Sequence, residues 1–155
     1  MAGEEIPEED KPRKRPDVAR EYSNDRITVF WEPRYCMHAA FCLMGNPQVF
    51  DAMRRPWIDL SDADADEVAG IVASCPTGAL HFRRLDGGEE ETAPDEVNVY
   101  ERPNGPLFLR GKVRIVSQDG KILREDTRVA LCRCGYSANK PFCDATHRRI
   151  GFRTT

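Results

Sequence analysis

The chain has 155 residues, of which 40% are hydrophobic and 32% charged, and its 23 Lys and Arg against 26 Asp and Glu give a net charge of -3. This length and low apolar content argue against one large hydrophobic core. They indicate one domain or two very small ones, which need disulfides, metals or oligomerisation as further support. The mild acidity argues against a general nucleic-acid-binding protein, and no apolar run approaches the about 18 residues needed to span a membrane.

The N-terminal segment, residues 1–24, is predicted to be a charged arm with one helical turn around Asp17–Tyr22. Met1–Asp10 is acidic and lacks the apolar stretch of a secretory signal, so we expect a cytoplasmic protein whose thiols stay reduced. The basic run Lys11–Arg15 could bind a partner, but the neighbouring acids favour a solvated tail.

Residues 25–85 are predicted to combine strands with one helix. Ile27–Trp31 is rich in β-branched and aromatic residues, which favours a strand. Ser61 and Asp62 indicate the start of a helix. That helix must end before Pro76, because the residue before a proline avoids the helical conformation. A further strand is expected to begin at Ala79–Phe82.

Residues 86–96 are acidic, contain Gly and Pro and hold almost no apolar residue, so we interpret them as a linker. Residues 97–155 are rich in strand-forming residues, and Asp119–Gly120 is a strong hairpin signal. Strands are predicted at residues 97–100, 107–109, 112–116, 122–123 and 128–131. The whole chain is therefore expected to be of the α+β class.

The six cysteines fall into two groups of three, each with a nearby histidine. Cys132 and Cys134 are separated by a single residue and could form a disulfide only with strain. Close pairs of thiols with a distant third are typical of metal ligands, so the spacing favours metal centres over a disulfide framework. The first group is Cys36, Cys42 and Cys75 with His38, and the second is Cys132, Cys134 and Cys143 with His147.

The second group lies in a stretch that resembles the CDGSH, or NEET, iron–sulfur family. That family's pattern is C-x-C-x2-(S/T)-x3-P-x-C-D-G-(S/T/A)-H, and residues 132–147 match it except at Ala145, where the family has glycine. Zinc stays open as an alternative, because three Cys and one His are also a zinc ligand set. The resemblance implies a [2Fe-2S] cluster bound by Cys132, Cys134, Cys143 and His147, with Ser137, Pro141 and Asp144 supporting the loop around it.

The chemistry of these residues fits that implication. Two thiolates one residue apart can bind one iron, and Cys143 and His147 can bind a second if they lie on a helical turn. Asp144 and Thr146 would then lie near the start of that turn, where they can form hydrogen bonds with backbone amides. If the backbone at Ala145 has a positive φ, an alanine there is strained.

The first group resembles the divergent mono-cluster ferredoxin family, which carries C-x-H-x3-C, over about residues 20–84. Single-cluster ferredoxins have a further cysteine in this loop, where the present chain has Ala39. Cys36, Cys42 and Cys75 can bind a [3Fe-4S] cluster, and a fourth ligand would allow [4Fe-4S]. His38 could be that ligand, form a hydrogen bond to a sulfide or face solvent.

The two resemblances imply a small ferredoxin-like α/β domain over residues 25–85 and a β-rich CDGSH domain over residues 97–155, each folding around its own cluster. His81, at the end of the first domain, is predicted to be an ordinary surface or edge residue rather than a ligand.

The implied function is an electron carrier that passes single electrons between a reductase and an acceptor. We expect no enzyme, because all six cysteines are assigned as ligands and no Ser–His–Asp, P-loop or dinucleotide pattern is present. One alternative is cluster storage, transfer to apo-iron–sulfur proteins, or redox and pH sensing through the His-ligated cluster. Another is a structural role of the metals in a subunit of a larger enzyme. A homodimer through the β-rich half and a monomer both stay open.

Overall fold

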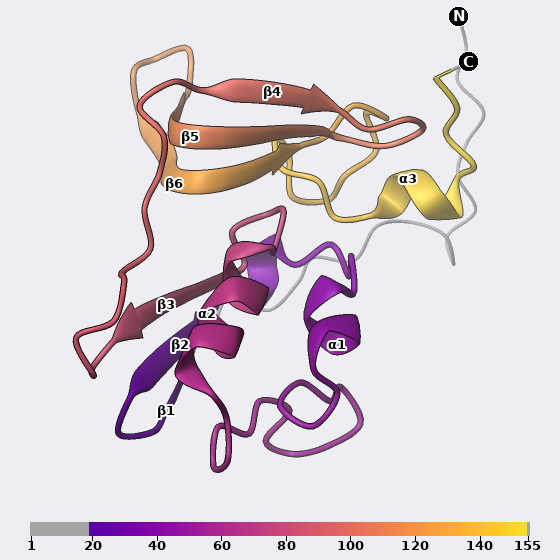
Figure 1. Cartoon of the computed structure of the whole chain (residues 1–155). Coiled ribbons are helices and arrows are strands. Elements are labelled where there is room, and N and C mark those ends of the chain that lie inside the picture. Colours follow the sequence, from indigo (N-terminus) through magenta and orange to yellow (C-terminus); the bar gives the residue numbers. More distant parts are fainter. Residues whose placement is uncertain (1–18, 155) are drawn as a thin grey trace, which may run out of the picture.

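The computed structural model describes residues 19–154, so most of the predicted arm, with the basic run Lys11–Arg15, lies outside the described residues. The chain is of the predicted α+β class and contains two small antiparallel sheets, one above the other in Figure 1. None of the helices within residues 19–154 is long and apolar enough to cross a membrane.

The first half of the chain, up to residue 85, holds a sheet in the order β1-β2-β3. Its elements are β1 (Arg20–Ser23), β2 (Ile27–Trp31), the 3-10 helix η2 (Pro33–Tyr35), α1 (Phe41–Gly45), α2 (Ala65–Ala73) and β3 (Leu80–Arg84). The second half holds a sheet in the order β4-β5-β6. Its elements are β4 (Asn98–Glu101), β5 (Leu107–Val116), β6 (Ile122–Leu131) and α3 (Thr146–Arg149).

The first sheet is built around β2, which is confirmed as a strand where the β-branched run predicted one. Tyr22 of β1 lies opposite Val29 of β2, so the helical turn predicted around Asp17–Tyr22 is wrong at its described end. Pairing with β2 outweighs the weak local preference for a helix. Ile27 and Val29 are fully buried, and they pack in one apolar cluster with Val68 of α2.

Helix α2 begins later than the sequence indicated. Asp64 is the N-cap residue, and its carboxylate accepts hydrogen bonds from the backbone amides of Asp66 and Glu67. The predicted start at Ser61 and Asp62 is therefore wrong by about one turn. The helix ends at Ala73, as the proline rule requires, and the chain turns directly into Cys75.

Strands β5 and β6 form one long hairpin around the predicted Asp119–Gly120 turn, in which Gly120 has a φ of 89°. Each is a continuous strand of 10 residues, so the breaks predicted within them are wrong. In β5 the pairing continues through a register shift between Arg110 and Val113. Gly111 lies in this shift with a φ of 138°, close against the backbone of residues 96–97, which leaves no space for a Cβ.

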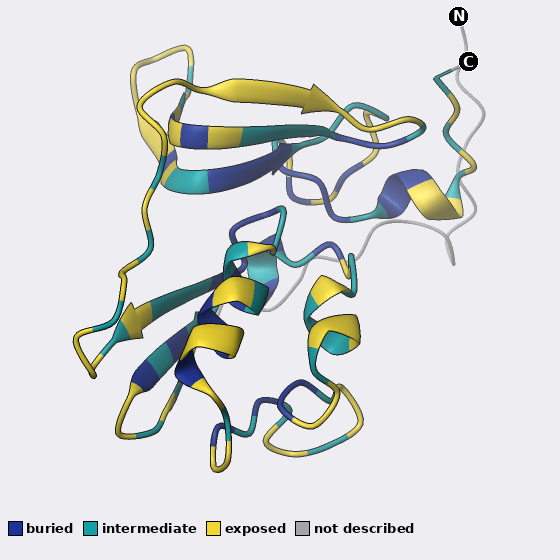
Figure 2. Cartoon of the chain, viewed as in Figure 1, coloured by how far each residue is buried: buried dark blue, intermediate teal, exposed yellow. Residues whose placement is uncertain are grey.

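The two halves share part of their core. Tyr35 and Ala79 of the first half form one buried cluster with Val113, Val129 and Phe142 of the second. The first half also has a core of its own around Ile27 and Val68, whereas the core of the second half is completed by residues of the first. Strand β4 is exposed along its whole length, whereas β6 carries buried residues toward the first half (Figure 2).

A polar network also crosses this junction, and His81 of β3 lies in it. Its Nδ1 atom is 2.8 Å from Glu91 of the linker, and its Nε2 atom is 3.0 Å from Asp126 of β6. His81 lies on an edge strand, as predicted, but its side chain is only 22% exposed and its two carboxylate partners were not predicted. Burial lowers the pKa of His81, but the two carboxylates outweigh it and raise that pKa to about 9.

We expect the His81→Gln variant to lose stability relative to the parent protein at neutral pH and to lose less at pH 10. The pKa of His81 in the folded protein is about 9, against an ordinary value of 6.5. Its contribution to the free energy of unfolding is therefore complete below pH 6.5 and is lost as the pH rises through 9. The contribution lost is at most about 3 kcal/mol. Arg124 and Arg128 also face this network.

The measurement is the free energy of unfolding of both proteins in urea from pH 6 to pH 10. Other titrating groups cancel in the difference between the two proteins. A difference that stays constant over this range would show that His81 is not charged in the folded protein.

Candidate metal centres

The second group of predicted ligands lies in the loop between β6 and α3, where its members form two pairs. The Sγ atoms of Cys132 and Cys134 are 3.8 Å apart. The Sγ atom of Cys143 is 3.5 Å from Nδ1 of His147, which lies in α3. The amide of Cys132 donates to the carbonyl of Pro141 at 2.8 Å, and the amide of Cys143 donates to the carbonyl of Ala130 at 2.9 Å. These two backbone bonds place one pair beside the other.

Asp144 holds the shape of this loop. One carboxylate oxygen accepts hydrogen bonds from the amide and hydroxyl of Thr146, and the other accepts from the amide of Ala138 at 2.9 Å. Asp144 thus bonds backbone amides as predicted, whereas the hydroxyl of Thr146 donates to Asp144 instead. Ser137 donates to the carbonyl of Phe142 at 2.6 Å, which closes the loop on itself.

Backbone amides also point at sulfur. The amide of Tyr136 lies 3.5 Å from Sγ of Cys134, and the amide of Ala145 lies 3.4 Å from Sγ of Cys143. Amides that converge on anionic groups in this way stabilise their negative charge. The loop therefore suits thiolates that bind a metal.

Burial dominates the electrostatics of this loop. It raises the pKa of the Cys143 thiol to about 11, together with the repulsion of a thiolate by Asp144. Burial also lowers the pKa of His147, with a smaller contribution from Arg148. Without a cation, these groups favour a neutral thiol and a neutral imidazole. A bound metal supplies the positive charge that a thiolate needs here, so the donor set fits a metal centre.

The first group of predicted ligands converges on one cavity of about 820 Å³. Cys36 follows η2, Cys42 lies in α1 and Cys75 follows α2, so the fold brings together three separate segments. Burial, followed by the proximity of Cys75 and Cys36, raises the pKa of Cys42 to about 11. Trp31 and Trp57 line the same cavity, where their apolar rings limit the access of water.

His38 lines this cavity as well. Its Nδ1 atom is 3.8 Å from Sγ of Cys36, although the residue is exposed. The backbone at His38 and Ala40 is left-handed, with φ values of 56° and 66°. Left-handed residues let this short loop bend so that His38 lies beside the cavity. His38 is therefore placed where a fourth ligand could bind.

The two groups differ in how their thiols lie. The second lies as two pairs in one loop, and the first lies as three thiols around a cavity. Thiols with a histidine can bind zinc or an iron–sulfur cluster, so the donor sets suit a metal centre of either kind. Within residues 19–154, no three His, Cys, Asp or Glu side chains are grouped tightly enough to hold one metal ion.

Comparison with protein families agrees with this geometry. Residues 22–85 match the family described as divergent 4Fe-4S mono-cluster, and residues 104–148 match the one described as iron-binding zinc finger, CDGSH type. The chain is a divergent 4Fe-4S mono-cluster domain fused to a CDGSH iron–sulfur domain. The uncharacterized protein YjdI of Escherichia coli strain K12 is 34% identical over 62 residues, which are 40% of this chain and 82% of YjdI. YjdI of strain O157:H7 gives the same values.

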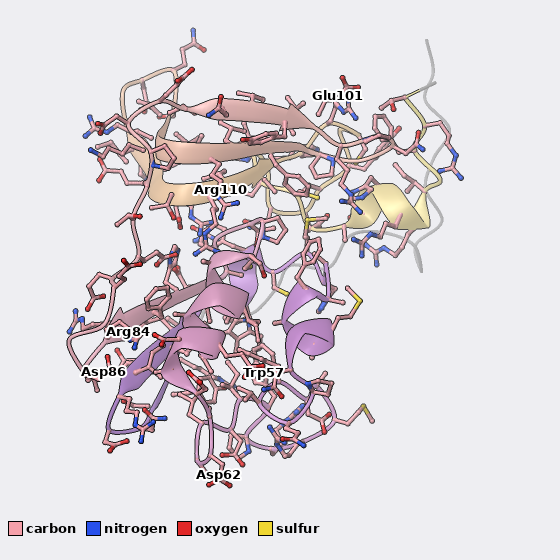
Figure 3. The ribbon with its side chains drawn as sticks, viewed as in Figure 1. Trp57, Asp62, Arg84, Asp86, Glu101 and Arg110 are labelled. Carbon is pink, nitrogen blue, oxygen red and sulfur yellow. The ribbon has the colours of Figure 1, made fainter. Side chains whose placement is uncertain are left out.

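The ligand loops of the mono-cluster and CDGSH domains are adjacent, which the sequence did not indicate. Met37 and Cys143 belong to one buried apolar cluster, and Ala39 and Ala145 pack against it. Arg148 donates to the carbonyl of His38 at 3.1 Å. Figure 3 shows sulfur atoms on both sides of the junction between α3 and α1. No sequence signal connects segments about a hundred residues apart, so this contact had to come from the structure.

Ala145 is the position at which the chain departs from the CDGSH pattern. Its φ is 72°, so the condition under which alanine is strained is met. Glycine adopts this conformation without steric cost, which explains the residue that the family has here. In this chain the hydrogen bonds of Asp144 maintain the conformation of the loop, although the alanine at position 145 is strained.

We expect Ala145→Gly to stabilise the CDGSH domain by about 1 kcal/mol, because it removes the left-handed strain of an alanine. Urea unfolding of the purified protein measures this change. The matched control is Ala138→Gly in the same loop, where φ is not positive, and glycine there should destabilise or have no effect. A loss of stability in Ala145→Gly would contradict the strain.

Proposed function

We propose that the protein carries single electrons between a reductase and an acceptor protein. It would use a [4Fe-4S] or [3Fe-4S] cluster in the mono-cluster domain and a [2Fe-2S] cluster in the CDGSH domain. Iron–sulfur clusters supply one-electron chemistry when bound. The observation that carries the proposal is the direct contact between the two ligand loops, at Met37 and Cys143.

The residues of this contact suit such a role. Met37 is 1% exposed and Cys143 is 4% exposed, so both side chains are shielded from solvent where the loops meet. The hydrogen bond from Arg148 to the carbonyl of His38 fixes one loop against the other. A contact through buried side chains supports exchange of electrons within one molecule, because less solvent has to reorganise around it.

The proposed role is that of an electron carrier rather than an enzyme. Three of the six cysteines line the mono-cluster cavity and three lie in the CDGSH loop. This placement leaves no thiol as a separate nucleophile. Partner proteins would supply and remove the electrons.

We expect Cys36→Ser and Cys132→Ser to remove one redox centre each. The parent protein should show two reversible one-electron waves in film voltammetry and two EPR species across its redox states. Each variant should lose the wave and the EPR species of its own domain and keep those of the other. If neither centre of the parent protein can be reduced and reoxidised, electron carriage is wrong.

We expect His38→Ala to convert the mono-cluster centre from four irons to three. His38 lines the cavity at 3.8 Å from Cys36, and its loss leaves only three thiol ligands. The measurement is EPR of the oxidised protein, in which a [3Fe-4S] cluster gives a signal and a [4Fe-4S] cluster does not. Met53→Ala is the control, since Met53 is 93% exposed and does not line the cavity. An oxidised-state signal already present in the parent protein would show that His38 is not a ligand.

A second function, cluster delivery to an apo-iron–sulfur protein, is favoured by the uneven exposure of the CDGSH loop. Gly135 and Tyr136 beside Cys134 are exposed, whereas Cys143 and His147 are buried. An acceptor could therefore approach one pair of ligands first. Incubation with an apo-ferredoxin tests this. If the cluster stays with this protein in both redox states and at mildly acidic pH, delivery is wrong.

A further inference from the structure

Two arginines of β6, in the CDGSH domain, are buried in the mono-cluster domain. The guanidinium group of Arg128 has a side-chain exposure of 4%. Its Nη1 atom donates to the carbonyls of Val72 and Cys75 at 2.9 and 2.6 Å. Its Nη2 atom donates to the carbonyl of Leu80 at 2.8 Å. All three acceptors lie between the last turn of α2 and the start of β3, in the segment that carries the predicted ligand Cys75.

Donors from the other domain also lie at the C-terminal end of α2. The last carbonyls of a helix have no partner within the helix, and cations near them are stabilising. Helix α2 has no basic residue in its own last turn. The CDGSH domain supplies this charge instead, since Arg110 of β5 also donates to the carbonyl of Ala73 at 2.8 Å (Figure 3). Three bonds from one planar group fix the direction of the turn, which a single flexible cation could not do.

Arg124 binds the same turn from its other side. It donates to the carbonyl of Gly78 at 2.9 Å, and its guanidinium lies 3.4 Å from the centre of the Tyr35 ring, next to Cys36. A Cβ at Gly78 would lie 2.8 Å from the carboxylate of Asp126, so β6 lies directly on this turn. Strand β6 therefore contacts the segments of two predicted ligands of the mono-cluster centre.

The charges of this network favour an anionic centre nearby. Arg124, Arg128 and protonated His81 carry three positive charges, against two negative charges on Glu91 and Asp126. The sum is +1, in a region where the arginine side chains are almost completely buried. An iron–sulfur cluster bound by thiolates is anionic, and nearby charge is one of the factors that set its reduction potential.

We propose that Arg128 is a positioning residue for the mono-cluster centre, so that the CDGSH domain completes a metal site in the other domain. Arg128 orients the Cys75 turn through three backbone carbonyls and does not touch the metal. The proposal rests on the cluster that the proposed function assigns to the mono-cluster domain. It predicts that retention of this cluster depends on a side chain outside the domain that ligates it.

The test measures loss of iron from the two-cluster protein to an Fe(II) chelator. EPR follows the mono-cluster centre, and visible absorption follows the [2Fe-2S] centre. We expect Arg128→Met to lose the mono-cluster centre between about 10-fold and 100-fold faster, the usual range for residues that support a metal ligand. Its EPR spectrum should change and its midpoint potential should fall, while the [2Fe-2S] centre is lost at the parental rate.

Arg128→Lys separates position from charge, and it carries the test if Arg128→Met does not fold. A single ammonium group retains the charge but cannot serve three carbonyls. We expect faster iron loss and an altered EPR spectrum, with a midpoint potential close to that of the parent. A parental rate and spectrum in Arg128→Lys would overturn the proposal.

Two controls distinguish positioning from a simple bond between domains. Glu91→Gln removes the ion-pair partner of Arg128 and leaves the three carbonyl bonds, so iron loss should stay near the parental rate even if stability falls. Arg114→Met removes an exposed arginine of β5 that pairs with Glu125, and should have no effect. If Glu91→Gln accelerates iron loss as much as Arg128→Met, the proposal is wrong.

Failure of this inference is distinguishable from failure of the proposed function. If the parent protein binds no iron and sulfide in the mono-cluster domain, both are overturned. If it binds a cluster that is reversibly reduced, and Arg128→Met has no effect on that cluster, only the role of Arg128 is overturned.

Discussion

The structure depends on the burial of Arg128 between the two domains. A guanidinium group carries five N–H donors and a charge that cannot be removed, so burial without partners would cost several kcal/mol. The partners of Arg128 are carbonyls of the mono-cluster domain and the carboxylate of Glu91 in the linker. Because a planar donor set fits few arrangements of acceptors, this one residue fixes how β6 lies on the Cys75 turn.

The apolar contacts explain why such a bond between the domains is needed. Each sheet has only three strands, and the buried cluster around Val129 is completed by Tyr35 and Ala79 from the other domain. The CDGSH domain therefore draws part of its core from the other domain, whereas the mono-cluster domain also has a core of its own around Ile27 and Val68. The junction that supplies the missing core also brings Met37 against Cys143, so the fold that stabilises the chain is the fold that places the two ligand loops together. Metal binding can add further stability to both domains.

Local features of the fold were accessible from the sequence because they depend on local chemistry. The β-branched run of β2 and the Asp119–Gly120 turn were predicted and are confirmed, since propensity and turn geometry act over a few residues. Apart from the start of α2, where Asp64 is the cap, the predictions that were wrong involve longer distances. Strand β1 exists because it pairs with β2, and β5 is continuous because Gly111 allows a register shift at a close backbone contact. His81 has no signal of its own, because its environment comes from Glu91 and Asp126.

The sequence alone determined the two ligand groups, the two family resemblances and the strained position at Ala145. These follow from cysteine spacing and from the conformations that single residues can adopt. Only the tertiary structure decided that the cavity collects Cys36, Cys42 and Cys75, that the ligand loops are adjacent, and that Arg128 serves the other domain. The physical reason is that hydrogen bonds and apolar contacts between segments up to about a hundred residues apart depend on how the sheets pack together. Packing of this kind is a property of the whole chain and leaves no local pattern in the sequence.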